Sequence, residues 1–118
     1  MGLFGFSKAD RLLKRSEFIE LSKIGKKIQN DQFIVIYSPS RDKRTRLGIT
    51  ASKKVGKAIE RNRIKRQIRE FFRLNRQNIS DFWDINIIVR KEAVGLSSDR
   101  IHSTLKDVFK GIQRKKNI

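Results

Sequence analysis

Between about Ala58 and Gln77 the apolar residues recur every three or four positions, which is the period of an α-helix. At roughly 100° per residue, Ile64, Ile68, Phe71 and Phe72 fall on one stripe. Arg61 lies at the edge of that stripe, and the rest of the circumference is mostly basic. The pattern therefore predicts a helix that buries one side and exposes a wall of positive charge on the other.

Three other segments have the composition of β-strands. Residues 32–38 are rich in β-branched and aromatic side chains, residues 46–52 alternate between larger and smaller or polar residues, and residues 84–91 place Ile85, Ile87 and Val89 on one face. A polar, basic turn separates the first two segments, so we expect them to form an antiparallel hairpin.

Amphipathic helices are predicted near both ends of the chain. Ser16 is a suitable N-cap for a short helix that carries Phe18 and Leu21, and Gly25 is a suitable stop. A longer helix is expected from about Asp99, capped by Ser98. Its core-facing stripe would comprise Ile101, Leu105, Val108, Phe109 and Ile112.

The predicted order is helix, hairpin, helix, strand, helix, which indicates an α+β fold. We expect a two-layer α/β sandwich with a mixed sheet of about four strands and helices packed mainly on one face. No linker or internal repeat divides the chain, so residues 1–118 are expected to form a single domain, with residues 1–7 and 113–118 as flexible ends.

Charge narrows the possible partners. The chain carries 29 Lys and Arg against 12 Asp and Glu, a formal net charge of +17 on 118 residues. In the segment 53–76 only Glu60 and Glu70 oppose the basic residues, and uncompensated repulsion of this kind is relieved by a polyanion. We expect an RNA partner, and neither membrane nor DNA. The chain has no cysteine and no apolar run of membrane-spanning length, which favours a cytoplasmic protein.

Catalytic groups are scarce. His102 is the only histidine, and it follows a core position of the last predicted helix, so we expect it at the surface. Asp81 and Asp84 flank two aromatic residues and are expected in a turn. Without a clustered acid, base or nucleophile, the sequence predicts no catalytic residue and no metal ligand on this chain.

The segment RLGITASKKVGKAIERNRIKRQIREFFR resembles the most characteristic stretch of the bacterial ribonuclease P protein component. Its RNR box is Arg61, Asn62 and Arg63, preceded at the family's interval by Lys53 and Lys54. RLLKRSEF near the start of the chain also matches, and the resemblance extends over residues 8–112. It implies the ribonuclease P protein fold, which is of the ribosomal protein S5 domain 2-like kind.

In function, the resemblance implies a protein subunit of an endoribonuclease, a hydrolase that removes the 5′ leader of precursor tRNA. The partners would be a catalytic RNA subunit and precursor tRNA, and the catalytic centre would lie on the RNA. Mg²⁺ is expected at the RNA active site, with no cofactor held firmly by the protein.

The resemblance also assigns residues to two RNA-binding surfaces. The catalytic RNA would contact Lys53, Lys54, Arg61, Asn62, Arg63, Lys65, Arg66 and Arg69. Asn62 would act by fixing the start of the helix or a local loop. The leader would enter a cleft between the first helix and the sheet, at Arg11, Lys14, Arg15, Phe18 and Tyr37.

Alternatives remain at this stage. Two family aromatic positions of the cleft are Ser22 and Ile36 here, which leaves fewer surfaces for base stacking. Phe18 and Tyr37 would equally suit ordinary core packing. A ribosomal protein or a basic DNA-binding domain would share the charge and the basic helix, but neither accounts for the SKK to RNR segment.

Overall fold

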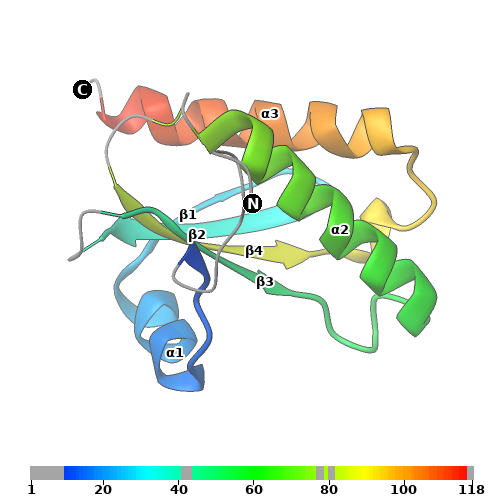
Figure 1. Ribbon diagram of the computed structural model, residues 1–118, viewed down its shortest axis with the longest axis horizontal. Coiled ribbons are helices and arrows are strands. Elements are labelled where there is room, and N and C mark those ends of the chain that lie inside the picture. Colours follow the sequence, from blue (N-terminus) through cyan, green and yellow to red (C-terminus); the bar gives the residue numbers. More distant parts are fainter. Residues whose placement is uncertain (1–9, 41–43, 77–78, 80–81, 117–118) are drawn as a thin grey trace.

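The computed structural model describes residues 10–40, 44–76, 79 and 82–116. A four-stranded sheet lies at the centre, with α2 and α3 on one face and the shorter α1 on the other (Figure 1). The mixed α+β sandwich predicted from the sequence is thus confirmed. In chain order the elements are α1 (Arg15–Ile24), β1 (Lys26–Gln29), β2 (Phe33–Pro39), β3 (Arg46–Thr50), α2 (Ala58–Asn75), β4 (Trp83–Val89), the 3₁₀ helix η3 (Lys91–Ala93) and α3 (Ser98–Lys116).

The predicted hairpin between residues 32–38 and 46–52 is wrong. The strand order is β1-β2-β4-β3, so β4 separates the two segments. β4 pairs antiparallel with β2 and parallel with β3, with Val35 and Ile49 both opposite Ile87. The parallel pair requires a crossover, and α2 makes it. Periodicity specifies that a segment is a strand, but it does not specify the neighbour.

The actual hairpin joins β2 to β1, a strand that the sequence pattern did not reveal because only Ile28 in it is apolar. Its turn is built on Asn30, whose side-chain carbonyl accepts hydrogen bonds from the backbone N–H groups of Gln32 and Phe33 at 3.1 and 2.8 Å. Asn followed by Asp is a recognised turn signal. This turn signal was the best indication in the sequence that a strand, β1, ends just before Asn30.

The apolar stripe of α2 lies where the sequence predicted it. Ile64, Ile68 and Phe72 are fully buried and Phe71 is 2% exposed, all within one core cluster with the inward residues of the sheet. The predicted stripe of α3, from Ile101 to Ile112, belongs to the same cluster. These two helices therefore share one apolar layer on the sheet, and their packing fixes the rotation of α2 about its axis.

One expectation about α3 needs correction. Its cap is Ser97 rather than Ser98, because the Ser97 Oγ accepts the N–H of Arg100 at 3.3 Å and its carbonyl accepts the N–H of Ile101 at 3.0 Å. The helix continues to Lys116, and the expected flexibility of residues 113–118 stays a prediction. Residues 1–7 and 117–118 lie outside the described residues.

α1 begins one residue before its predicted cap. The helix starts at Arg15 after Lys14, and Ser16 lies in its first turn. Glu17 supplies the cap, since its Oε1 accepts the backbone N–H groups of Lys14 and Leu13 at 3.2 and 3.4 Å. Gly25 ends the helix as predicted, though for a steric reason: a Cβ there would stand 2.6 Å from Ile36 on β2.

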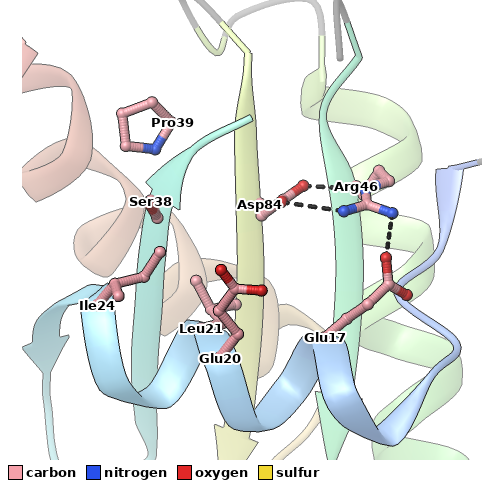
Figure 2. A pocket seen from close by; sticks show the side chains of 8 residues that line it. All are labelled: Glu17, Glu20, Leu21, Ile24, Ser38, Pro39, Arg46 and Asp84. Atoms are coloured by element: carbon pink, nitrogen blue, oxygen red, sulfur yellow. Dashed lines mark hydrogen bonds and ion pairs between the residues drawn. The ribbon is translucent and has the colours of Figure 1, made fainter. Parts of the chain in front are cut away.

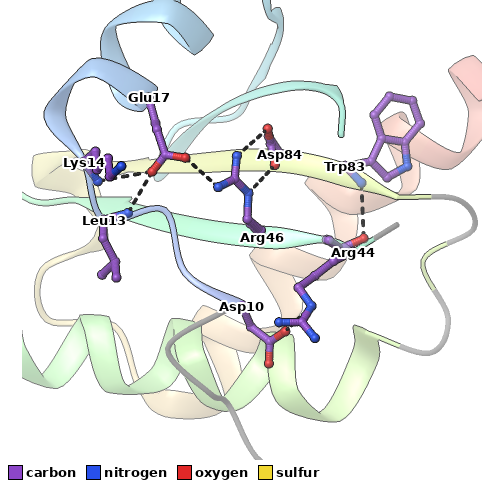
Figure 3. A network of polar contacts seen from close by, with 9 residues as sticks. Asp10, Leu13, Lys14, Glu17, Arg44, Arg46, Trp83 and Asp84 are labelled. Atoms are coloured by element: carbon purple, nitrogen blue, oxygen red, sulfur yellow. Dashed lines mark hydrogen bonds and ion pairs between the residues drawn. The ribbon is translucent and has the colours of Figure 1, made fainter. Parts of the chain in front are cut away.

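Arg46 on β3 fastens α1 to the sheet. Its guanidinium donates to both carboxylate oxygens of Asp84 on β4, at 3.0 and 3.1 Å, and its Nη1 donates to Glu17 on α1 (Figure 3). The bonds to Asp84 and Glu17 outweigh burial and raise the pKa of Arg46. Burial alone would raise the pKa of Glu17, but the Arg46 and backbone hydrogen bonds lower it overall.

Among the described residues, no helix combines the length and apolar character needed to cross a membrane.

The Arg46 contact predicts a pH-dependent stability. Glu17→Gln is expected to lower the free energy of unfolding by about 1 kcal/mol at pH 7, because a charge-assisted hydrogen bond is lost. The pKa of Glu17 is depressed in the folded state, so this contribution is complete above its ordinary value of 4.5 and disappears as the pH falls below it. Urea unfolding between pH 3 and 7 measures the difference. Glu92→Gln removes an exposed carboxylate as the control, and an equal loss for both variants would contradict the assignment.

Candidate RNA-binding site

The rotation of α2 distributes its charged residues over distinct sides of the helix. Asn62 and Arg66 point away from the core stripe and are exposed. Lys65 and Arg69 point toward β3 and the segment before α1. Arg63 points toward the loop that precedes α3. A single cationic wall, as the helical wheel suggested, is therefore divided into parts with different surroundings.

Several arginines of the wall are neutralised within the protein. Arg73 pairs with Glu70, and Arg76 pairs with Asp10 at 3.2 Å, which is 5% exposed. Arg63 contacts Glu60 at 3.5 Å and donates to the Leu96 carbonyl at 3.0 Å. These bonds occupy guanidinium N–H groups that could otherwise donate hydrogen bonds to a phosphate. The strongest candidates for RNA contact are therefore the cations outside this set.

A groove runs between α2, the edge strand β3 and the chain entering α1. It consists of two adjoining hollows of about 140 and 450 Å³, which share Leu13, Phe18, Ile49 and Lys65. We call it the cationic groove. Its remaining lining residues are Arg11, Leu12, Arg15, Leu47, Gly48, Thr50, Ala51, Ser52 and Arg69.

The chain before α1 forms one wall of the cationic groove by extending the sheet. Arg11 forms a parallel bridge with Leu47, and the N–H of Leu12 donates to the Leu47 carbonyl at 3.0 Å. This contact brings Arg11 close to Arg69 across the groove. Partial burial, and then the charge of Arg11, lower the pKa of Arg69. Two like charges held together in this way favour an anion between them.

Phe18 lies over the backbone of Gly48 and is half-buried. A Cβ placed on Gly48 would come within 2.5 Å of the Phe18 ring, so glycine is what lets the ring approach the strand. The ring lines both hollows of the groove. An aromatic surface is thereby fixed among Arg11, Arg15 and Lys65, the combination that single-stranded nucleic acid binds through base stacking and phosphate contacts.

A separate pocket of about 280 Å³ lies toward the other end of α1 and has the opposite character. Glu17, Glu20 and Asp84 line it, together with Arg46, which is already bonded to two of them (Figure 2). Its apolar wall includes Leu21 and Ile24. Carboxylates repel phosphate, so the surface around α1 has a cationic end and an acidic end.

Comparisons with known proteins identify the family of this chain. The family model for ribonuclease P matches residues 6–113. The ribonuclease P protein component of Desulfosudis oleivorans is 52% identical over 109 residues, which cover 92% of this chain and 90% of that protein.

This chain belongs to the ribonuclease P protein family. The family relationship supports a role in tRNA 5′ processing and implies an RNA partner.

Solved structures of the ribonuclease P protein family have the same fold. A Staphylococcus aureus RNase P protein mutant with defective mRNA degradation activity superimposes with a TM-score of 0.86 at 36% identity, covering 90% of both chains. The RNase P protein from Thermotoga maritima gives a TM-score of 0.80 at 35% identity, covering 86% of this chain and 96% of that one.

The leader cleft expected of a ribonuclease P protein is only partly reproduced. Arg11, Arg15 and Phe18 line the cationic groove, whereas Lys14 lines neither hollow. The assignment of Tyr37 is wrong. Its side chain is 1% exposed in the core, and its ring packs edge-on against Trp83. Alternation along β2 already placed Tyr37 on the core face with Phe33 and Val35, opposite to Ile36.

The RNR box also differs from expectation. α2 begins at Ala58, so Asn62 lies in its second turn and does not fix the helix start. Arg61 lies at the core edge, as predicted, with its Nε buried and lacking a hydrogen-bond partner. Lys53 and Lys54 lie beyond the end of β3. They are exposed in the turn that follows β3, which the Val55 N–H closes on the Ser52 carbonyl at 3.0 Å.

Two features of the site, and the place of His102 outside it, escaped the sequence prediction. Leu13 is 52% exposed and lines both hollows, and Gly48 admits the Phe18 ring. A glycine inside a strand often marks a close approach, which was the available signal for Gly48. His102, expected at the surface, lies between α2 and α3, where its Nε2 is 3.0 Å from the Gln67 Oε1.

Replacing Arg63 and replacing Arg66 should have different effects on the stability of the protein. Arg63→Ala is expected to lower the free energy of unfolding by about 1 kcal/mol, because it deletes the bond to the Leu96 carbonyl. Arg66→Ala is expected to leave stability within about 0.5 kcal/mol, since Arg66 is exposed. Chemical denaturation of the RNA-free proteins provides the measurement, and equal stabilities would contradict a structural role for Arg63.

Proposed function

We propose that this chain is the protein subunit of a ribonuclease P holoenzyme, in which it assists endonucleolytic removal of the 5′ leader from precursor tRNA. The cationic groove is the observation that carries the proposal. It joins a fixed aromatic ring to several cations, which suits a single-stranded RNA segment and has no evident purpose in folding. The proposed setting is the cytoplasm.

Two RNA contacts follow from the two exposed sets of cations. Arg66, with Asn62 and the turn residues Lys53 and Lys54, faces outward and suits the catalytic RNA. Lys65 and Arg69 line the groove beside Phe18, so we assign them to the leader rather than to the catalytic RNA. The helix α2 then contacts both RNAs at once. Charges on adjacent sides of one rigid helix would hold the leader at a fixed position relative to the catalytic RNA.

Phosphate contact should dominate leader binding. Phe18 is the one aromatic residue that lines the described groove, because Tyr37 faces the core. Stacking on one ring contributes about 1–3 kcal/mol, whereas each phosphate neutralised adds a salt-dependent increment without regard to sequence. A leader held mainly in this way would be recognised chiefly as a single strand and little by its bases.

The bond cleavage itself is assigned to the RNA. Glu17 and Asp84 are occupied by Arg46 and hold α1 in place. The described residues contain no group of three or more His, Cys, Asp or Glu side chains that could hold a metal ion. We propose that Mg²⁺ bound by the RNA supplies the hydrolytic chemistry, while the protein neutralises phosphates and positions the leader.

Reconstitution tests this division of labour. The purified protein in Mg²⁺ is expected to leave precursor tRNA intact, whereas the protein with its catalytic RNA should release the leader at low Mg²⁺, where the RNA alone is slow. Product length on a sequencing gel identifies the cut site. RNA-free cleavage that persists after nuclease digestion of the preparation would contradict the proposal, as would a complete lack of stimulation.

Phe18 and Gly48 provide a second test. Phe18→Ala should raise the KM for a precursor with a long leader about fivefold or more and leave a precursor with a one-nucleotide leader nearly unchanged, because one stacking contact is lost. Gly48→Ala should act in the same direction, since its Cβ displaces the ring while keeping it present. Gly56→Ala is the matched control, because a Cβ there meets Val94 at an ordinary 3.6 Å. Equal effects on both leaders would assign Phe18 to the core.

A further inference from the structure

Ile59 has the most exposed side chain of the large apolar residues that the structure describes, at 80% of its accessible surface. It is the second residue of α2. At about 100° per residue, Ile59 lies on the opposite side of the helix from Ile68, at the centre of the outward face. Asn62 lies one turn further along this face and Arg66 two turns further, and both are exposed.

The surroundings of Ile59 are cationic. Lys57 is the N-cap residue of α2, and its side chain makes no capping hydrogen bond. The exposed turn that contains Lys53 and Lys54 comes shortly before Lys57 in the chain. The positive end of the helix dipole adds to these charges. Glu60 is the acidic residue of this turn, and Arg63 already pairs with it. A purely solvated face gains nothing from an isoleucine at its centre.

Two other exposed apolar residues, Leu13 and Ile24, lie in different surroundings. Leu13 lines the cationic groove, and Ile24 lines the acidic pocket beside Glu20. Ile59 alone of these three combines high exposure with the outward cations of α2. The ligand that matches this combination carries phosphates around a flat, apolar surface, and an unpaired nucleotide has that chemistry.

We propose that Ile59 packs against an unpaired base of the catalytic RNA, with Asn62 hydrogen-bonding the edge of that base and Arg66 and Lys53 holding the flanking phosphates. The inference rests on the proposed function for the identity of the RNA, and it adds a nucleotide-specific contact to a surface so far described only by charge. Because the contact is apolar, it should contribute affinity that salt does not screen.

The test compares Ile59→Ala with Arg66→Ala in binding to the catalytic RNA over a series of KCl concentrations. Ile59→Ala is expected to raise Kd about tenfold at every concentration with an unchanged slope of log Kd against log[KCl]. Arg66→Ala should raise Kd and reduce that slope by about one. Ile24→Ala, the same substitution at a residue 61% exposed on α1, should leave Kd unchanged.

Chemical probing locates the contact. In the complex with Ile59→Ala, a small set of unpaired nucleotides should become reactive at their base edges, whereas Arg66→Ala should leave those bases protected. Unchanged binding and probing for Ile59→Ala, beside the expected loss for Arg66→Ala, would overturn the Ile59 inference and leave the proposed function intact. Failure of the unaltered protein to bind the catalytic RNA would overturn the proposed function instead.

Two further measurements exclude other roles for Ile59. Thermal unfolding of the RNA-free variants should coincide with that of the unaltered protein, and a lowered Tm for Ile59→Ala would assign the residue to folding. Sedimentation without RNA should show the same oligomeric state for both proteins. Concentration-dependent self-association that Ile59→Ala abolishes would overturn the inference by assigning the residue to a contact between copies of the chain.

Discussion

The burial of one stripe of α2 against the sheet is the constraint on which the RNA-binding surface depends. Ile64, Ile68 and Phe72 have no exposed surface, and a helix anchored by such residues cannot rotate without opening the core. Each basic side chain therefore has a fixed direction. Lys65 and Arg69 line the groove and Arg66 faces outward, and this division follows from apolar packing on the opposite side of the helix.

Charge in this protein has two separate uses. Arg46 and Arg76 are paired with carboxylates and hold the chain around α1 to the sheet and to α2. Arg66 and the turn residues Lys53 and Lys54 are instead exposed to solvent. Since the chain has a formal charge of +17, folding must hold many like charges close together. Internal pairs lower this repulsion at positions where an RNA is not expected, and the acidic pocket at the other end of α1 further restricts where a phosphate backbone can lie.

The groove depends on contacts between segments far apart in the sequence. Arg11 bridges Leu47 on β3, and Phe18 lies on Gly48 of the same strand. The resemblance to the ribonuclease P family predicted that Arg11, Arg15 and Phe18 share one cleft. It assigned Lys65 and Arg69 to the catalytic RNA, although both line the same groove. Tyr37 was misassigned although its alternation with Phe33 and Val35 gave its face correctly. For Tyr37 the local period of the strand was therefore a better guide to the direction of the side chain than the motif match.

The sequence by itself determined the helices, three of the four strands, the core stripes and the family, because these depend on local periodicity and on motifs that are contiguous in the chain. Tertiary structure decided which strands are neighbours. The backbone hydrogen bonds of a strand can be made by a strand that is near in the sequence or by one that is distant. Tertiary structure also decided which arginines are free for RNA. Arg63 and Arg66 are both arginines of the same basic helix, and the contacts with Glu60 and the Leu96 carbonyl distinguish the first from the second.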